Sequence, residues 1–252
     1  MSVPVSPVTV PQATPPESLS WWDRFIGVFY APVSTFADIA RKPDFLFPLI
    51  AVVISSVAVT ETLLAKIGIE RIIRTSLEQS GRASRMSPEQ LDRAVSRGAQ
   101  FGAIIAHVAG VLGPPIVLLL FAAIGLGLLN LVFGAQVNFL TSLAVTCYAY
   151  LPGILAGLMG LAMILFGDPE HFNAQTPIPS SVAFFLDPTD VPKPLYSLAA
   201  SFDIFWLWFL ALLGIGFSEA SGKKVKALPA FLSFFGIWMI WVLGKMGLAA
   251  LM

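Results

Sequence analysis

Long apolar stretches alternate with short polar segments along this chain of 252 residues. A bilayer core about 30 Å thick needs about 20 apolar residues in a helix that rises about 1.5 Å per residue. Five stretches reach or approach this length, at residues 46–65, 101–133, 139–166, 198–217 and 228–252. The pattern therefore predicts an all-α integral membrane bundle of five transmembrane helices, with the two termini on opposite sides of the membrane.

Polar segments separate these stretches and predict the loops. Residues 134–138 leave room only for a tight turn, which predicts an antiparallel hairpin of the second and third helices. Residues 66–100 predict two helices outside the membrane, and Ser87 with Pro88 matches the N-cap and first position of the second helix, which continues into the membrane. Residues 167–196 contain six prolines and predict an irregular loop.

The N-terminal region follows a different pattern. Residues 1–19 are rich in Pro and Ser and predict a disordered tail, whereas residues 20–252 are predicted to form the membrane domain. Ser20 has the spacing of an N-cap, and Pro32 predicts the start of a second helix. Apolar residues then recur at three- and four-residue intervals: Trp22, Phe25, Ile26, Phe29, Val33, Phe36 and Ala40. Charged residues fall between them, which predicts an amphipathic helix in the headgroup plane: Asp23, Arg24, Asp38 and Arg41.

The composition supports a membrane location and excludes other classes. Hydrophobic residues make up 56% of the chain and charged residues only 12%, too few to cover the surface of a soluble protein. Fifteen basic residues balance fifteen acidic ones, so the sequence predicts no nucleic-acid partner. The single cysteine, Cys147, cannot form an intramolecular disulfide. The partner that the composition predicts is the lipid bilayer.

The distribution of basic residues leaves the membrane orientation open. With the N-terminus in the cytoplasm, that side would hold six Lys and Arg residues and the opposite side nine. Since the side richer in these residues usually faces the cytoplasm, the total favours the reverse orientation. The densest cluster without acidic neighbours, Lys223, Lys224 and Lys226, favours a cytoplasmic N-terminus.

Three segments carry a resemblance to a known family. Residues 25–49 combine an amphipathic helix, a proline and a charged stretch before an apolar helix. Residues 132–152 place a short turn before a helix with two tyrosines and a Leu-Pro pair, and residues 202–222 contain a D-x-F-x-x-W pattern. The motif residues are Tyr148, Tyr150, Pro152, Asp203, Phe205 and Trp208. In their order and spacing these segments resemble bacterial Yip1-domain proteins over roughly residues 20–250.

The resemblance to the Yip1 family implies a five-helix protein of the bacterial cytoplasmic membrane, with a cytoplasmic N-terminus and no established catalytic reaction. For eukaryotic relatives it implies a part in vesicle trafficking alongside small GTPases. The acidic-Leu-Tyr-Gly-Pro motif of those relatives has no counterpart here, since residues 44–48 read DFLFP. A small GTPase is therefore not expected as a partner.

Five polar residues lie within or at the ends of the apolar stretches: Glu61, His107, Asn130, Asp203 and Lys245. A charge at the bilayer centre costs roughly 2.5 to 3.5 kcal/mol, so such residues indicate a function or a partner. One hypothesis is a proton or ion path, with Asp203 as its best candidate. The alternative is structural, because Glu61 and Lys245 can extend toward the headgroups and His107 can hydrogen-bond a neighbouring helix.

Small residues recur at helical spacing in the third stretch, at Gly153, Gly157 and Gly160. This spacing predicts close helix approach, either at a dimer interface or within one bundle. A cluster that could hold a divalent cation follows at Asp168, Glu170 and His171, although solvation explains it equally well. Signatures of the common hydrolases, nucleotide-binding proteins and zinc proteases are absent from the sequence, so we predict no enzyme and no cofactor.

Taken together, these patterns favour a non-enzymatic membrane scaffold or organiser. It would act through helix packing and through contacts with lipids, other membrane proteins or a second copy of itself. The alternative is a small permease or an ion- or proton-conducting protein built on the same bundle.

Overall fold

The computed structural model describes residues 18–251 except residues 80, 169–172, 174–175 and 189. The predicted disordered tail therefore lies almost wholly outside the described residues. Within the described part the fold is all-α, as predicted, and its β-type pairing is a single isolated bridge between Ser181 and Asp203.

Four candidate membrane spans are long and apolar enough to cross a bilayer, which confirms a multi-pass membrane bundle. They are α3 (Leu46–Lys66), α5 (Pro88–Gly127) with its π-helical end η2 (Leu128–Val132), α6 (Phe139–Ala149) with α7 (Pro152–Phe166), and α10 (Ala227–Leu251). The remaining apolar helix, α9 (Ile204–Ala220), has only 17 residues. A fifth crossing through α9 therefore stays a prediction.

Two of the predicted spans are broken. The stretch 139–166 is divided between α6 and α7 at residues 150–151, and Pro152, which has no N–H to donate, begins α7. The stretch 198–217 is divided between α8 (Lys193–Ser201) and α9, since the chain leaves the helix at Phe202 and Asp203. Helix α8 also begins inside the segment predicted to be irregular.

The polar hairpin before α5 agrees with the sequence. Helix α4 (Ile69–Gln79) and the 3₁₀ turn η1 (Ala83–Arg85) precede α5, which begins at Pro88 and continues without a break into the membrane-length segment. The Ser87 side chain accepts a hydrogen bond from the Gln90 backbone N–H, and the Gln90 side chain accepts one from Ser87. This capping box satisfies two N–H groups at the helix start.

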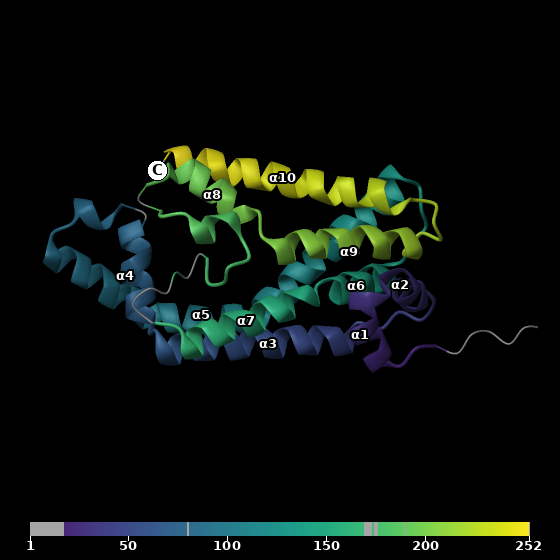
Figure 1. The fold of residues 1–252 in the computed structure, drawn as a ribbon, viewed down its shortest axis with the longest axis horizontal. Coiled ribbons are helices and arrows are strands. Elements are labelled where there is room, and N and C mark those ends of the chain that lie inside the picture. The colour runs from purple at the N-terminus through teal and green to yellow at the C-terminus, as the bar shows by residue number, and fades with distance from the viewer. Residues whose placement is uncertain (1–17, 80, 169–172, 174–175, 189, 252) are drawn as a thin grey trace, which may run out of the picture.

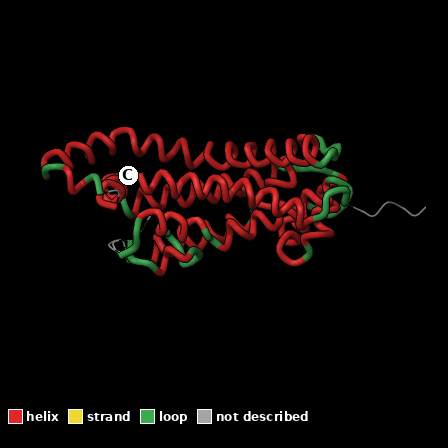
Figure 2. The backbone as a smooth tube through the Cα atoms, turned by 90° about the horizontal axis from the view of Figure 1, so that it is seen from above, coloured by secondary structure: helices red, strands yellow, loops and turns green. Residues whose placement is uncertain are grey.

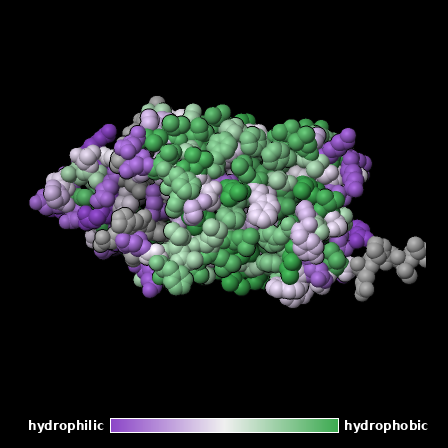
Figure 3. Space-filling model, in the orientation of Figure 1, coloured by the Kyte–Doolittle hydropathy of each residue, from purple (hydrophilic) through white to green (hydrophobic). Residues whose placement is uncertain are grey.

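The helices lie lengthwise, and most connections gather near the two ends of the molecule (Figures 1 and 2). Helices α1 (Trp21–Tyr30) and α2 (Pro32–Arg41) lie at one end together with the turn between α9 and α10, whereas α4 and the C-terminus lie at the other (Figure 1). An apolar band separates the polar ends in Figure 3. This distribution is that of a bundle oriented across a bilayer, with its ends in water.

The protein core surrounds α6, whose residues from Thr141 to Ala149 are all buried. Phe36 and Ile39 of α2 and Phe209 and Phe217 of α9 complete this core from neighbouring helices. Helix α6 is therefore the centre of the bundle, and lipid contact falls mainly to the helices around it.

Helices α1 and α2 are amphipathic, and they begin where the sequence predicts: Ser20 caps α1, and Pro32 is at the start of α2. Asp23 and Arg41 are exposed, as expected of charged residues in the headgroup plane, whereas the expectation is wrong for the other two charged residues. Arg24 and Asp38 are buried within the protein, and a set of apolar residues is exposed instead: Trp21, Trp22, Ile26, Tyr30 and Val33. The reason is that the two helices dock on the bundle through α2, so that their charged faces meet each other.

Candidate functional site

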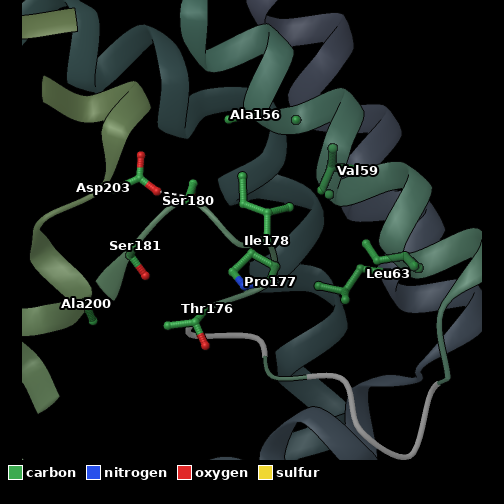
Figure 4. A pocket seen from close by; sticks show the side chains of 13 residues that line it. Val59, Leu63, Ala156, Thr176, Pro177, Ile178, Ser180, Ser181, Ala200 and Asp203 are labelled. Carbon is green, nitrogen blue, oxygen red and sulfur yellow. Dashed lines mark hydrogen bonds between the residues drawn. The ribbon is translucent and has the colours of Figure 1, made fainter. Parts of the chain in front are cut away.

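A cavity of about 370 Å³ lies between α3, α7, residues 176–181 and the break between α8 and α9 (Figure 4). Its apolar wall is formed by Val59, Leu63, Ala156, Ile164 and Ile178, together with two glycines of α7. Its polar groups come from Thr176, Ser180, Ser181 and Asp203. In Figure 4, Val59 and Leu63 lie on the opposite side of the cavity from Asp203. A mostly apolar cavity with a few polar groups on one side is typical of small-molecule sites.

Asp203 lies on the polar side of this cavity and is held there by hydrogen bonds from its own chain. Its Oδ1 atom accepts hydrogen bonds from the backbone N–H groups of Phe205 at 2.9 Å and Trp206 at 3.1 Å, so Asp203 is the N-cap of α9. Its Oδ2 atom accepts a hydrogen bond from the Ser180 hydroxyl. A carboxylate is favourable here because the first N–H groups of a helix lack partners and carry partial positive charge.

The loop of residues 176–181 is hydrogen-bonded to the break between α8 and α9. The backbone N–H of Ile204 donates to the Ser180 carbonyl oxygen at 2.9 Å, beside the bridge between Ser181 and Asp203. The Tyr196 hydroxyl of α8 lies 3.5 Å from Thr176 Oγ1 and accepts a hydrogen bond from Asn173 Nδ2 at 3.1 Å. The irregular backbone of this loop is thus held in place by hydrogen bonds to α8 and to the start of α9.

The other intramembrane polar residues lie apart from this cavity. Glu61 and His107 pair with each other between α3 and α5, with His107 Nε2 at 3.2 Å from Glu61 Oε1, and about half of each side chain is exposed. Lys245 Nζ lies 4.4 Å from the centroid of the Trp241 ring on the same helix. The five candidates therefore do not form one continuous path through the described residues.

Asn130 closes the turn between η2 and α6. Its Nδ2 atom donates to the Val137 carbonyl oxygen at 2.8 Å, and its Oδ1 atom accepts from the Val137 N–H at 2.9 Å. Asn138 then caps α6 by accepting from the Thr141 N–H at 2.8 Å. These bonds explain why five residues suffice for the predicted hairpin turn.

The three glycines of α7 all face groups of their own chain. A Cβ atom at Gly157 would come within 2.7 Å of Ser55 Oγ on α3, and one at Gly153 within 2.8 Å of the Tyr150 ring. A Cβ atom at Gly160 would meet only Ile178, at 3.9 Å, and Gly157 and Gly160 both line the cavity. The structure thus brings two of the predicted packing residues and Asp203 to one place.

The family-motif residues contribute mainly to the core. Tyr148 is fully buried, and its hydroxyl has no hydrogen-bond partner in the part of the chain that is described. Tyr150 contacts the Phe209 ring edge to face, with centroids 5.3 Å apart, and Trp208 contacts Phe29 of α1 in the same way. Pro152 begins α7, and Phe205 donates its backbone N–H to Asp203.

A buried ion pair near the N-terminus was missed from the sequence. Arg24 donates through Nε to Asp38 Oδ2 at 2.9 Å and through Nη1 to the Lys42 carbonyl oxygen at 2.9 Å. Arg41 contributes a further bond to Asp38 at 2.9 Å. The sequence pattern that could have predicted this pair is the helical hairpin, because a turn at Pro32 brings charged residues of the two helices to face each other.

The predicted cation cluster falls largely outside the described residues, since only Asp168 of its three members is described. Among the described residues, no group of three or more His, Cys, Asp or Glu side chains is arranged to hold a metal ion.

The fold and the positions of its polar groups define the class of this protein: an integral, multi-pass, all-α membrane protein. A family model for the Yip1 domain matches residues 26–245. The chain therefore belongs to the Yip1 domain family, as the sequence motifs indicated. Comparisons with curated proteins and with solved structures gave no match.

Proposed function

We propose that this protein is a non-enzymatic membrane scaffold that organises lipids or other membrane proteins through its helix surfaces. The proposal rests on the hydrogen bonds of the Asp203 carboxylate, because Asp203 is the strongest candidate for transport chemistry. Both of its oxygens accept hydrogen bonds from its own chain, two from the α9 backbone and one from Ser180. A carboxylate engaged in this way supports the fold and is poorly placed to carry a proton or an ion.

The exposed face of α1 supplies a surface for such contacts. Trp21, Trp22 and Tyr30 are exposed there, and amphipathic aromatic side chains favour the boundary between lipid and water. Lys223, Lys224 and Lys226 lie in or beside the turn between α9 and α10, at the same end of the bundle (Figure 1). We infer that the protein lies in the bacterial cytoplasmic membrane and that this end of the bundle faces the cytoplasm. Basic clusters in short loops favour the cytoplasmic side.

A small permease is the second candidate, favoured by the break between α8 and α9. Discontinuous helices with irregular backbone between them form the substrate sites of many transporters. The cavity beside Asp203 lies at such a break. The two candidates differ in whether the charge of Asp203 takes part in the function.

The Asp203→Asn variant separates them, since Asn is as good an N-cap as Asp and lacks the charge. Its amide nitrogen replaces the oxygen that accepts from Ser180 and can donate to the same hydroxyl. We expect proteoliposomes with either protein to show no proton or cation flux above that of empty vesicles, and the variant to keep the unfolding temperature of the wild type to within a few degrees. A flux that the wild type shows and the variant loses would establish the permease instead.

The contacts of the scaffold are tested by a photocrosslinking residue at Trp22 in native membranes, with Phe36 as the buried control position. We expect reproducible adducts with a protein partner or a second copy from position 22 and none from position 36. Equal adduct patterns from the two positions would contradict a contact surface on α1.

A further inference from the structure

The cavity beside Asp203 has the features of a site for one hydrocarbon chain. Its wall consists of Val59 and Leu63 from α3, Ala156 and Ile164 from α7, and Ile178 from the loop. Its volume of about 370 Å³ falls in the range of small-molecule pockets, roughly 300 to 1,000 Å³. Since α3 and α7 belong to candidate membrane spans, lipids are the molecules expected around this wall.

A second cavity, of about 360 Å³, continues the apolar surface along α3 and α7. It shares Val59 and Gly157 with the first cavity and is lined by Ile154 and Leu161 of α7 and by Ala51 of α3, among others. The two cavities together follow the interface of α3 and α7, so a chain that is too long for the first has apolar surface available beyond it.

The polar side of the first cavity indicates the chemistry of the ligand's polar end. Ser181 is buried and lines the cavity, and within the described residues its hydroxyl makes no hydrogen bond. The Asp203 Oδ2 atom accepts one bond, from Ser180, and retains a second lone pair. A hydroxyl group of the ligand matches both side chains, because it can donate a hydrogen bond to Asp203 and accept one from the Ser181 hydroxyl.

Charge excludes the common anionic lipids from this place. The Asp203 carboxylate is half-buried among apolar groups, where repulsion of a second negative charge is stronger than in water. A cavity of this size also has little room for a phosphate headgroup in addition to a chain. We infer that the cavity binds the hydrocarbon chain of a neutral, hydroxyl-bearing lipid of the monoacylglycerol type. This inference goes beyond the scaffold role and does not depend on it.

The test uses the full-length protein in detergent and a monoacylglycerol with a photoreactive diazirine in its chain. The crosslinked residues are identified by mass spectrometry. Labelling is expected on α3, on α7 and on residues 176–181. A fatty acid with the same chain and diazirine, used at pH 8, tests the charge argument and is expected to label these segments at least about tenfold less, corresponding to about 1.4 kcal/mol.

Two variants test the site itself. Gly160→Leu adds an apolar side chain to the lining of the cavity, and its Cβ atom meets nothing closer than Ile178 at 3.9 Å. Ser181→Ala removes the free hydroxyl and is expected to weaken labelling by roughly threefold to tenfold, the usual range for one hydrogen bond. The matched control is Gly236→Leu on α10, where no neighbouring atom lies within 4 Å of an added Cβ.

We expect Gly160→Leu to abolish labelling of these segments while its unfolding temperature stays that of the wild type, and Gly236→Leu to label normally. Equal labelling of the Gly160→Leu and Gly236→Leu variants would overturn the inference, as would equal labelling by the fatty acid. Neither result bears on the scaffold proposal, which is judged by flux and by crosslinking from α1.

Discussion

Arg24 of α1 and Asp38 of α2 form a salt bridge with 2.9 Å between Nη2 and Oδ2, and their side chains are only 4% and 3% exposed. The pair joins the two helices that cover one end of the bundle, and Asp38 also accepts the Leu19 backbone N–H at 3.1 Å. Two charges buried together are costly to separate, because the remaining charge loses its partner without regaining water. The pair therefore holds the N-terminal hairpin in one arrangement.

Removing either partner alone is expected to destabilise the protein strongly. Arg24→Met or Asp38→Leu should lower the free energy of unfolding by about 3 to 5 kcal/mol, the range for breaking a buried pair. The double variant Arg24→Met with Asp38→Leu should lose less than either single variant, since the only charge that it leaves without this partner is the exposed guanidinium of Arg41. The measurement is denaturant unfolding in detergent micelles.

The control for this cycle is Arg41→Ala, because the Arg41 side chain is 52% exposed although it bonds the same carboxylate. Its expected loss is below about 1 kcal/mol, as for exposed pairs. If the double variant were as unstable as the sum of the two single variants, Arg24 and Asp38 would not be coupled.

Asn130 and Val137 provide a second test, in the turn between η2 and α6. Asn130→Ala leaves both backbone groups of Val137 without their partner, so the expected loss is about 1 to 3 kcal/mol. Proteolysis within residues 134–138 should accelerate accordingly. Thr62→Ala, which removes one exposed side-chain hydrogen bond on α3, serves as the control and should change neither quantity measurably.

Local features of the chain could be predicted because their causes are local. Ser20 and Ser87 cap helices as their spacing indicates, and the short turn at residues 134–138 leaves no alternative to a hairpin. The membrane class also follows from segment length and composition, which require no knowledge of packing. These predictions depend on neighbours within a few residues.

The parts that were missed depend on contacts between distant residues. An amphipathic pattern shows that Arg24 lies on a charged face, yet it does not show that Asp38 covers that face. Ser180 and Asp203 are 23 residues apart, and nothing in a proline-rich loop indicates that it returns to the start of a helix. Asp203 itself satisfies two patterns, an intramembrane charge and an N-cap, and only the backbone break shows that it caps α9.

Gly157 distinguishes packing within the bundle from packing between two copies. Gly157→Leu places a Cβ atom within 2.7 Å of Ser55 Oγ, and such overpacking costs about 1 to 3 kcal/mol. We expect a lower unfolding temperature with an unchanged oligomeric state, measured by light scattering of the detergent complex. Gly244→Leu on α10, with no atom within 4 Å of the added Cβ, is the matched control. A variant that loses oligomers but keeps its stability would place Gly157 at a dimer interface.

Tyr148 should tolerate the loss of its hydroxyl. The side chain is fully buried and the hydroxyl has no hydrogen-bond partner among the described residues, so Tyr148→Phe removes a polar group without breaking a hydrogen bond. We expect the free energy of unfolding to stay equal or to rise by up to about 1 kcal/mol. Tyr148→Ala should lower it by about 3 to 5 kcal/mol because of the cavity it leaves. A clear loss with phenylalanine would reveal a partner for the hydroxyl.

The orientation of the bundle can be measured with single cysteines, because the native Cys147 is fully buried and should give little background. Lys224→Cys lies in the turn between α9 and α10, and Ser84→Cys lies between α4 and α5, at the opposite end (Figure 1). In spheroplasts, a membrane-impermeant maleimide should label Ser84→Cys at once and Lys224→Cys only after permeabilisation. The reverse pattern would invert the proposed orientation but keep the crossing of the bundle. Labelling of both positions from outside would mean that the two ends do not lie on opposite sides of the membrane.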